Sequence, residues 1–297
     1  MSYQEIRPAR AEDRETILAF CAKTWQWGDY IEHVWDEWLH DSNGLLLVAT
    51  VDGNPAGISH MVMVSESDVW FEGLRVDPQF RQQGLARALN EFAVVEAVKR
   101  GATHARLAVD ASNTRSIHIT EHPDSQMHKV ATFTLFSALP LDQERGKKET
   151  QARTQLATLE DLDAIIAYVN ASNIFPMTGG LYHVSFKSIP MTVEFLEDKI
   201  VHQQVYLLRR WERIDGLAIA EIRGDHRGKT LSLGYIDGTV IESISLIAYD
   251  LRQRLSAMGA ERLRVYAPDL MLVRDALDGI GYDWEDSTFY IYERRLV

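Results

Sequence analysis

The sequence is 297 residues long, with 46% hydrophobic and 25% charged residues and a net charge of −12. These values are ordinary for a globular protein and exclude a disordered chain or a fibrous repeat, and the length suggests about two domains. The negative charge argues against binding to nucleic acid or to an anionic membrane, because both would repel the chain.

Cysteine content and the first residues indicate the compartment. The single cysteine, Cys21, cannot form an internal disulfide, which excludes a disulfide-stapled secreted scaffold. Residues 1–10 (MSYQEIRPAR) are charged and lack the apolar run of a signal peptide, and no stretch approaches 18 apolar residues. We therefore expect a cytoplasmic protein without a membrane segment.

The first half of the sequence alternates between strand and helix patterns. Apolar residues that recur every three or four positions predict a long helix over 83–100, and Asp77-Pro78 ends the strand before it. The other segments expected, in chain order, are a strand at 4–7, helices at 11–21 and 30–39, strands at 45–51, 56–64, 69–76 and 105–109, a helix between about 112 and 123, and a strand at 130–139.

A polar, charged stretch at 141–150 predicts a linker between two halves. After it the order of elements partly repeats, which predicts an α/β chain with two copies of one structure. The segments expected are strands at 154–157, 204–210, 215–222, 230–236, 262–267 and 287–294, and helices at 159–171, 240–258 and 270–277.

Residues 70–89 stand out because a strand, a short turn and Arg81-x-x-Gly84-x-Ala86 lead directly into the long helix. A helix N-terminus exposes unpaired N–H groups and the positive end of the helix dipole. Small residues at 84 and 86 let a phosphate approach the backbone, and Arg81 and Arg87 add charge-assisted contacts. The segment predicts a diphosphate-binding turn; the alternative is an ordinary strand–helix junction with a chance glycine.

This segment resembles motif A of the GNAT superfamily of acetyl-CoA-dependent N-acetyltransferases, through Val76-Asp77-Pro78 and Arg81-Gln82-Gln83-Gly84-Leu85-Ala86. The order of elements over 4–139 is also similar to that family's fold. The resemblance implies a tandem α/β protein whose domains are mixed, mostly antiparallel sheets flanked by helices. It implies an acetyl-CoA-binding GNAT domain at 1–140, the linker at 141–150 and a degenerate GNAT-like domain at 151–297.

The resemblance also implies which residues contact the cofactor. The backbone of the strand end pairs with the pantetheine arm, the N–H groups of the turn hold the pyrophosphate, and an asparagine after the fifth strand touches the arm. At these positions stand Leu74, Arg75 and Val76; Arg81, Gln82, Gln83, Gly84, Leu85, Ala86 and Arg87; and Asn113.

The reaction implied is direct attack of a neutral amine on the thioester carbonyl, which needs a proton acceptor. Several family members keep a glutamate four residues before the position of Val76, which implies Glu72 as the base. Strand alternation predicts that Glu72, Leu74 and Val76 share one face. The alternative is a solvent-facing strand glutamate.

Two departures from the family pattern matter. Residues 113–124 lack the tyrosine that many members use to reprotonate the thiolate, which leaves His118, Thr120 or water for that step. The strand at 230–236 leads into its helix through Asp237-Gly238 without Arg-x-x-Gly. We therefore expect the second domain to lack cofactor binding and to shape the acceptor pocket or pack against the first.

Two other patterns are weak. His118-x-x-Glu121-His122 has the spacing of an inverted zinc-protease motif, but Pro123 follows at once and no third ligand is placed, so no metal is expected. Residues 224–230 resemble a phosphate-binding loop, but the glycine spacing fails and the segment joins two strands, which favours a hairpin turn.

Residues 25–38 are rich in aromatic and acidic side chains. The aromatic residues favour core and pocket wall over a binding box, and the acidic ones favour a solvated helix face over attraction of a cationic amine. Cys21, within a helix, is expected to be a buried thiol. The residues concerned are Trp25, Trp27, Tyr30, Trp35 and Trp38, with Asp29, Glu32, Asp36 and Glu37.

Together these features predict an N-acetyltransferase that moves acetyl from acetyl-CoA to the primary amine of a small molecule in a ternary complex. The sequence does not identify the acceptor amine. Because members of the family often form dimers, the resemblance also allows a homodimer. The alternatives are a CoA-binding sensor without turnover and a protein N-acetyltransferase that acts on a terminus or a lysine.

Overall fold

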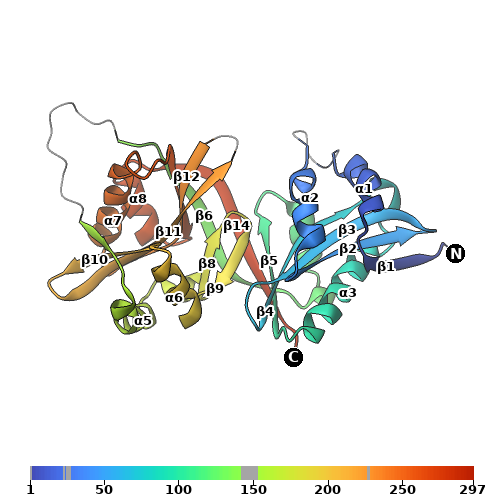
Figure 1. Ribbon diagram of the computed structural model, residues 1–297, viewed down its shortest axis with the longest axis horizontal. Coiled ribbons are helices and arrows are strands. Elements are labelled where there is room, and N and C mark those ends of the chain that lie inside the picture. Colours follow the sequence, from blue (N-terminus) through green and yellow to red (C-terminus); the bar gives the residue numbers. More distant parts are fainter. Residues whose placement is uncertain (1, 23, 25–27, 142–152, 226–227) are drawn as a thin grey trace. The chain divides into compact units, whose positions relative to one another are not determined.

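The computed structural model describes residues 2–22, 24, 28–141, 153–225 and 228–297 (Figure 1). Trp25, Trp27 and nearly all of the linker expected at 141–150 therefore lie outside the described residues. The chain forms two compact units, Met1–Leu107 with Glu293–Val297, and Ala108–Tyr292. These units divide the chain at other residues than the boundaries expected from the sequence.

The first unit contributes five sheet strands, β1 to β5, which lie side by side in chain order. The four leading strands pair antiparallel, and β4 and β5 pair parallel. Each strand was predicted, with bounds that differ by a few residues. They are β1 (Gln4–Pro8), β2 (Gly44–Val51), β3 (Asn54–Met63), β4 (Asp68–Val76) and β5 (His104–Asp110).

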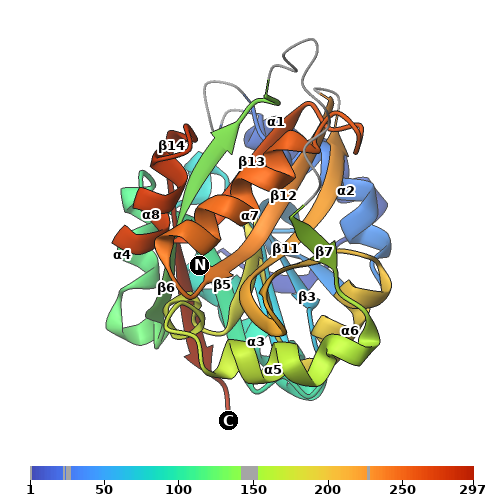
Figure 2. The same cartoon turned by 90° about the vertical axis from the view of Figure 1, so that its left-hand side faces the viewer.

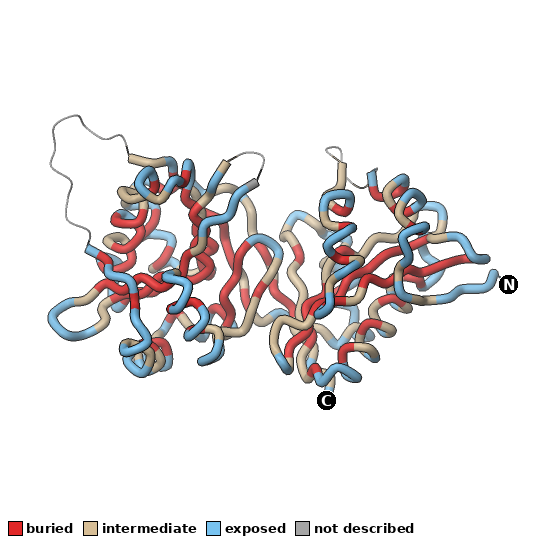
Figure 3. Tube along the Cα trace, viewed as in Figure 1, coloured by how far each residue is buried: buried red, intermediate tan, exposed pale blue. Residues whose placement is uncertain are grey.

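Helices cover both faces of this sheet. The long helix α3 (Leu85–Lys99) lies on one face, where Leu89 would be 3.2 Å from a Cβ on Gly57. The helices α1 (Arg14–Cys21) and α2 (Ile31–His40) lie on the other face. Figure 3 shows that buried residues follow the strands and the inner sides of these helices. The cluster under α1 and α2 consists of Ile17, Phe20, Cys21, Ile31, Trp35, Trp38, Leu46, Val48 and Ile58.

The second unit contains strands from both halves of the sequence. Its sheet has the order β14-β6-β13-β12-β11-β10-β7. The strand β6, which precedes the expected linker, pairs antiparallel with β13 here, and β12 pairs parallel with β13. The bounds are β6 (His128–Ala138), β7 (Thr154–Leu156), β10 (Val205–Arg210), β11 (Arg213–Asp225), β12 (Gly228–Gly238), β13 (Arg262–Pro268) and β14 (Asp283–Arg295).

Helices α7 (Ile241–Gln253) and α8 (Met271–Asp278) pack together on one face of the second sheet, where α7 crosses β11 and β12 (Figure 2). The opposite face carries α5 (Leu162–Asn170). The sequence did not predict the hairpin β8 (Leu181–Val184) and β9 (Lys187–Pro190), or α6 (Val193–Val201), because these segments are too short for a clear periodicity.

Candidate active site

The turn between β4 and α3 has the backbone geometry of an anion-binding loop. Gln82 and Gly84 have positive φ angles of 62° and 83°, and α3 begins directly after them. A Cβ on Gly84 would meet no atom within 4 Å, so the backbone at this point faces open space. Because the first N–H groups of a helix have no intrahelical partner, they are available to a bound phosphate.

Side-chain hydrogen bonds to the backbone stabilise this turn. The carboxylate of Asp77 accepts a 2.9 Å hydrogen bond from the N–H of Gln79. Arg81 donates through Nε to the carbonyl of Val76 at 3.3 Å, and Gln4 donates to the carbonyl of Gln83 at 3.3 Å. The contacts of Arg81 and Gln4 use carbonyl oxygens and so do not occupy the N–H groups at the start of α3.

Strand β4 separates from β5 just before this turn. The parallel pairing ends at Trp70 opposite Arg106, whereas β4 continues to Val76 paired with β3. The end of β4 that includes Leu74 therefore has one edge without a ladder partner. Such an edge can hold an extended ligand through backbone hydrogen bonds.

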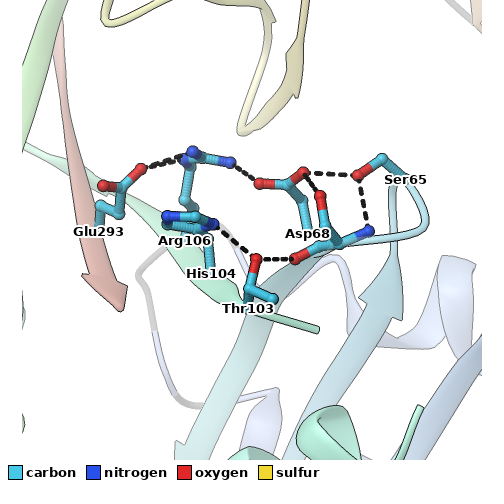
Figure 4. A network of polar contacts seen from close by, with 7 residues as sticks. Ser65, Asp68, Thr103, His104, Arg106 and Glu293 are labelled. Carbon is cyan, nitrogen blue, oxygen red and sulfur yellow. Dashed lines mark hydrogen bonds and ion pairs between the residues drawn. The ribbon is translucent and has the colours of Figure 1, made fainter. Parts of the chain in front are cut away.

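A network of charged and polar side chains lies where β4 and β5 are paired (Figure 4). The guanidinium of Arg106 contacts Asp68 on one side and donates to Glu293 at 2.7 Å on the other. Ser65 donates to Asp68 at 2.5 Å. Burial alone would raise the pKa of Asp68, but the hydroxyl of Ser65 and the charge of Arg106 outweigh it and hold that pKa below its ordinary value.

A bulge in β4 overturns the expected alternation. Glu72 lies opposite His60 and Arg75 lies opposite Ile58, because the register shifts between those two pairs. Gly73, at the bulge, has a φ of 70°. Directly paired residues share a face, so Glu72 faces α2 together with Arg75, and the prediction that Glu72 and Val76 share one face is wrong.

The side chain of Glu72 is held by a residue that the sequence did not single out. His60 Nδ1 lies 3.0 Å from Glu72 Oε1, and its ring stacks on Trp38 with 4.5 Å between centroids. His60 is 1% exposed, whereas the Glu72 side chain is 19% exposed. Only the strand pairing brings the two together, and without an alignment the sequence contains no signal for it.

Arg75 uses its side chain for a buried ion pair on the same face. Its Nε donates to Asp29 at 2.8 Å, and its guanidinium lies 5.5 Å from the ring centre of Tyr30. Burial raises the pKa of Tyr30 to about 12, so this hydroxyl stays protonated. Asp29, which precedes α2 and has a side chain only 2% exposed, is therefore paired with a cation of the protein itself, and the prediction of a solvated helix face is wrong for this residue.

The other acidic residues of α2 lie on its outer side. Glu32, Asp36 and Glu37 are exposed, which agrees with the predicted solvated helix face. Trp35 and Trp38 are buried, as predicted for core aromatics. Cys21 is buried as expected, and burial raises the pKa of its thiol to about 12.

Asn113 belongs to the second unit, where it caps α4 (Thr114–Thr120). Its side-chain oxygen accepts a 3.1 Å hydrogen bond from the N–H of Ser116. Its contact with a cofactor stays a prediction.

Because α4 ends at Thr120, His118 and His122 do not share a helix face, and among the residues that the structure describes no three potential ligands gather for a metal.

In the second unit, β12 separates from β13 much as β4 separates from β5. The start of α7, however, does not resemble the open Gly84 turn. The pairing of β12 with β13 ends at Leu233 opposite Val265. At the start of α7, Thr239 and Ser243 donate to the carboxylate of Asp215 at 2.8 and 2.7 Å. A carboxylate of the chain itself thus lies where an anion would bind.

Asp237, just before that turn, is 2% exposed and accepts three hydroxyl groups. Ser172 and Tyr235 each donate at 2.5 Å and Tyr168 at 3.3 Å. This cluster connects the end of β12 to α5 and the loop after it.

Residues 224–230 join β11 to β12 rather than a strand to a helix, as predicted, although 226–227 lie outside the described residues.

Residues 11–122 match the model of the Acetyltransferase (GNAT) family. This segment is therefore similar to that family over somewhat more than a third of the chain. The match includes the Gly84 turn and Glu72, and it indicates a transferase of the acyltransferase type. A search of curated proteins found no match. In the part of the chain that the structure describes, no helix is long and apolar enough to cross a membrane.

Solved GNAT structures are similar over the whole chain. A GCN5-related N-acetyltransferase from Sphaerobacter thermophilus is 14% identical with a TM-score of 0.60, covering 99% of this chain and 96% of that one. A tandem GNAT protein from the clavulanic acid biosynthesis pathway is 13% identical with a TM-score of 0.54, covering 99% of both chains. A GCN5-related N-acetyltransferase from Anabaena variabilis is 10% identical with a TM-score of 0.54, covering 99% and 73%. These likenesses confirm the predicted α/β fold class.

Proposed function

We propose that this chain transfers the acetyl group of acetyl-CoA to the primary amine of a small molecule by direct attack in a ternary complex. The observation that carries the proposal is the open Gly84 turn at the start of α3, directly beyond the point where β4 leaves β5. The GNAT match of residues 11–122 supports the same chemistry.

The turn and α3 would bind the pyrophosphate of the cofactor. The N–H groups of residues 82–87 supply donors, and the helix dipole favours the negative charge. The pyrophosphate fits this turn because Gly84 places no side chain over the backbone and Gln82 is exposed. Arg81 lies beside the turn and adds positive charge.

The free edge of β4 would hold the pantetheine arm through the backbone of residues 74–76. A backbone N–H there can also donate to the thioester oxygen as negative charge develops on it. Glu72 faces α2, and we place the acceptor amine on that face. The protein's net charge of −12 favours a cationic amine.

Glu72 would take the proton that makes the amine nucleophilic. The neutral amine nitrogen then forms a bond to the thioester carbon and the carbon–sulfur bond breaks. The second proton, which the attacking nitrogen loses as the amide forms, passes through water to the CoA thiolate, and Glu72 releases the first proton to solvent. Glu72 is suited to this role because it is partly exposed while one oxygen is fixed by His60.

The second unit would not bind acetyl-CoA. Asp215 already accepts hydrogen bonds at the start of α7, and its charge would repel a pyrophosphate. We assign this unit a role in shaping or supporting the acceptor site, as the sequence predicted.

The experiment is a thermal-unfolding titration with acetyl-CoA on the wild type, Gly84→Glu and Gly53→Glu. Gly53, in the turn between β2 and β3, has a φ of 84° and open space around it, so the backbone cost of the two substitutions is matched. Acetyl-CoA at 100 times its Kd stabilises the wild type by about 2.7 kcal/mol. We expect Gly53→Glu to keep this stabilisation and Gly84→Glu to lose it.

A panel of amines, amino acids, polyamines and peptides with free N-termini then identifies the acceptor by release of CoA thiol. Acetylation of small amines supports the proposal, whereas turnover restricted to peptides would assign a protein N-acetyltransferase instead. Binding of acetyl-CoA without turnover on any amine would leave a CoA-binding sensor. No stabilisation of the wild type by acetyl-CoA would overturn the proposal altogether.

A further inference from the structure

His60 is a buried polar residue with an unusual set of neighbours. It lies on β3 with 1% of its surface exposed, stacked under Trp38. Its Nδ1 is 3.0 Å from Glu72 Oε1, and its Nε2 is 3.8 Å from Asp41 Oδ2. Nε2 is buried without a hydrogen-bond partner among the described residues.

The location of the ring proton follows from the chemistry of the two groups. An ionised carboxylate only accepts hydrogen bonds, so the short contact with Glu72 requires the proton on Nδ1. A distance of 3.8 Å is too long for a hydrogen bond, which leaves Nε2 without a partner that would compete for the proton. The ring therefore donates from Nδ1 to Glu72.

Packing fixes the ring in this orientation. Trp38 covers one face of His60, and a Cβ on Gly44 would lie 2.5 Å from Nε2, so no side chain fits at position 44. The ring cannot rotate away from Glu72 without displacing the indole. His60 thus holds Glu72 Oε1 in place and leaves Oε2 for another group.

We infer that His60 is a positioning residue for Glu72: its Nδ1–H fixes one carboxylate oxygen so that the other faces the acceptor amine. The inference rests on the proposed function for the role of Glu72 as proton acceptor. The hydrogen bond also keeps Glu72 aligned before the amine arrives, which lowers the cost of reaching the reactive geometry.

The first test measures the tautomer of His60 directly. Nitrogen-15 NMR of labelled imidazoles at about pH 8 distinguishes a protonated ring nitrogen from a bare one. The signal of His60, among 10 histidines, is identified by its absence in His60→Asn. We expect the proton on Nδ1 in the wild type and loss of that preference in Glu72→Leu. A bare Nδ1 with the proton on Nε2 alone in the wild type would overturn the inference.

His183 provides an internal control for this measurement. It is fully buried in the second unit, and its Nδ1 lies 2.8 Å from Ser188 Oγ. Because Glu72 belongs to the first unit, the tautomer of His183 should be the same in the wild type and in Glu72→Leu. A change in both histidines would indicate general disruption of the fold and would count against the specific contact.

The second test compares two substitutions of His60, one that keeps an N–H donor and one that removes it. His60→Asn retains an N–H donor near the position of Nδ1, whereas His60→Leu keeps an apolar side chain without a donor. We expect kcat to fall about tenfold to a hundredfold in His60→Leu with the KM for the amine within about threefold, and most of kcat to return in His60→Asn. A merely structural role would make the two variants equally poor.

The outcomes separate this inference from the proposed function. Wild-type protein that binds acetyl-CoA but acetylates no amine overturns the proposed function, and with it this role of His60. Active wild-type protein whose kcat is unchanged in His60→Leu overturns the role of His60 alone.

Discussion

The indole ring of Trp38 lies directly against Gly73: a Cβ on Gly73 would be 2.5 Å from the ring atom Cζ3. Through this contact α2 packs against the bulge in β4, and the bulge places Glu72 on the same face of the sheet as His60. Gly73 is required twice over, once for its φ of 70° and once for the absence of a side chain under the indole.

Replacement of Gly73 by alanine should therefore cost more than the backbone strain alone. A positive φ costs a non-glycine residue about 1–2 kcal/mol, and the clash with Trp38 adds about 1–3 kcal/mol. Gly53→Ala, with a similar φ and open space, is the matched control and should lose only the first of these. Urea unfolding of both variants measures the difference; equal losses would show that Trp38 does not constrain the bulge.

The network around Asp68 predicts a dependence of stability on pH. The pKa of Asp68 is lower in the folded protein than in the unfolded chain, so its contribution to the free energy of unfolding is present at neutral pH. That contribution is lost as the pH falls below about 4 and through the folded-state pKa. Asp68→Asn should be less stable at pH 7 and should lose less stability between pH 5 and 3 than the wild type.

Chemical denaturation at a series of pH values measures this effect. Asp36→Asn, which changes an exposed carboxylate on α2, is the control and should keep the pH dependence of the wild type. A wild-type slope in Asp68→Asn would mean that other carboxylates account for the acid sensitivity.

The pair formed by Arg75 and Asp29 predicts strong coupling between two substitutions. Their side chains are 18% and 2% exposed, so removal of one partner leaves a buried charge. Asp29→Ala should cost about 3–5 kcal/mol, whereas Asp29→Leu combined with Arg75→Met should cost less than either change alone. A double-mutant cycle of unfolding free energies measures the coupling, and additive losses would exclude it.

The cluster around Asp237 predicts a loss of stability without a loss of cofactor binding. Asp237→Ala leaves the hydroxyls of Ser172, Tyr168 and Tyr235 without their shared acceptor, which should cost about 3 kcal/mol or more. Stabilisation by acetyl-CoA should stay at the wild-type value, measured by the same thermal titration. The control is Asp283→Ala, an exposed position in the second unit, and weaker acetyl-CoA binding in Asp237→Ala would place a cofactor contact there.

The sequence was most informative where a pattern is local. The periodicity of α3, the break at Pro78 and the glycine at position 84 lie within one short segment, so the turn and its helix were predicted within two residues.

Features that depend on pairing between distant segments were not predictable. The bulge at Gly73 reverses the face of Glu72, and simple alternation gives no sign of it. Glu72 and Asp41 both approach His60 only after β3, β4 and the residues that follow α2 come together. The units differ from the expected halves because β6 pairs with β13, a contact between residues more than 100 positions apart.

Residues 293–297 complete a unit whose other residues, 1–107, are synthesised much earlier. Glu293 contacts Arg106, Arg294 contacts Glu91, and the N–H of Leu296 donates to the carbonyl of Thr103. At about 5–20 residues per second, these contacts form on the order of ten seconds or more after residue 107 is synthesised. Until residues 293–297 are synthesised, the edge of β5 that lies beside β14 lacks its neighbour.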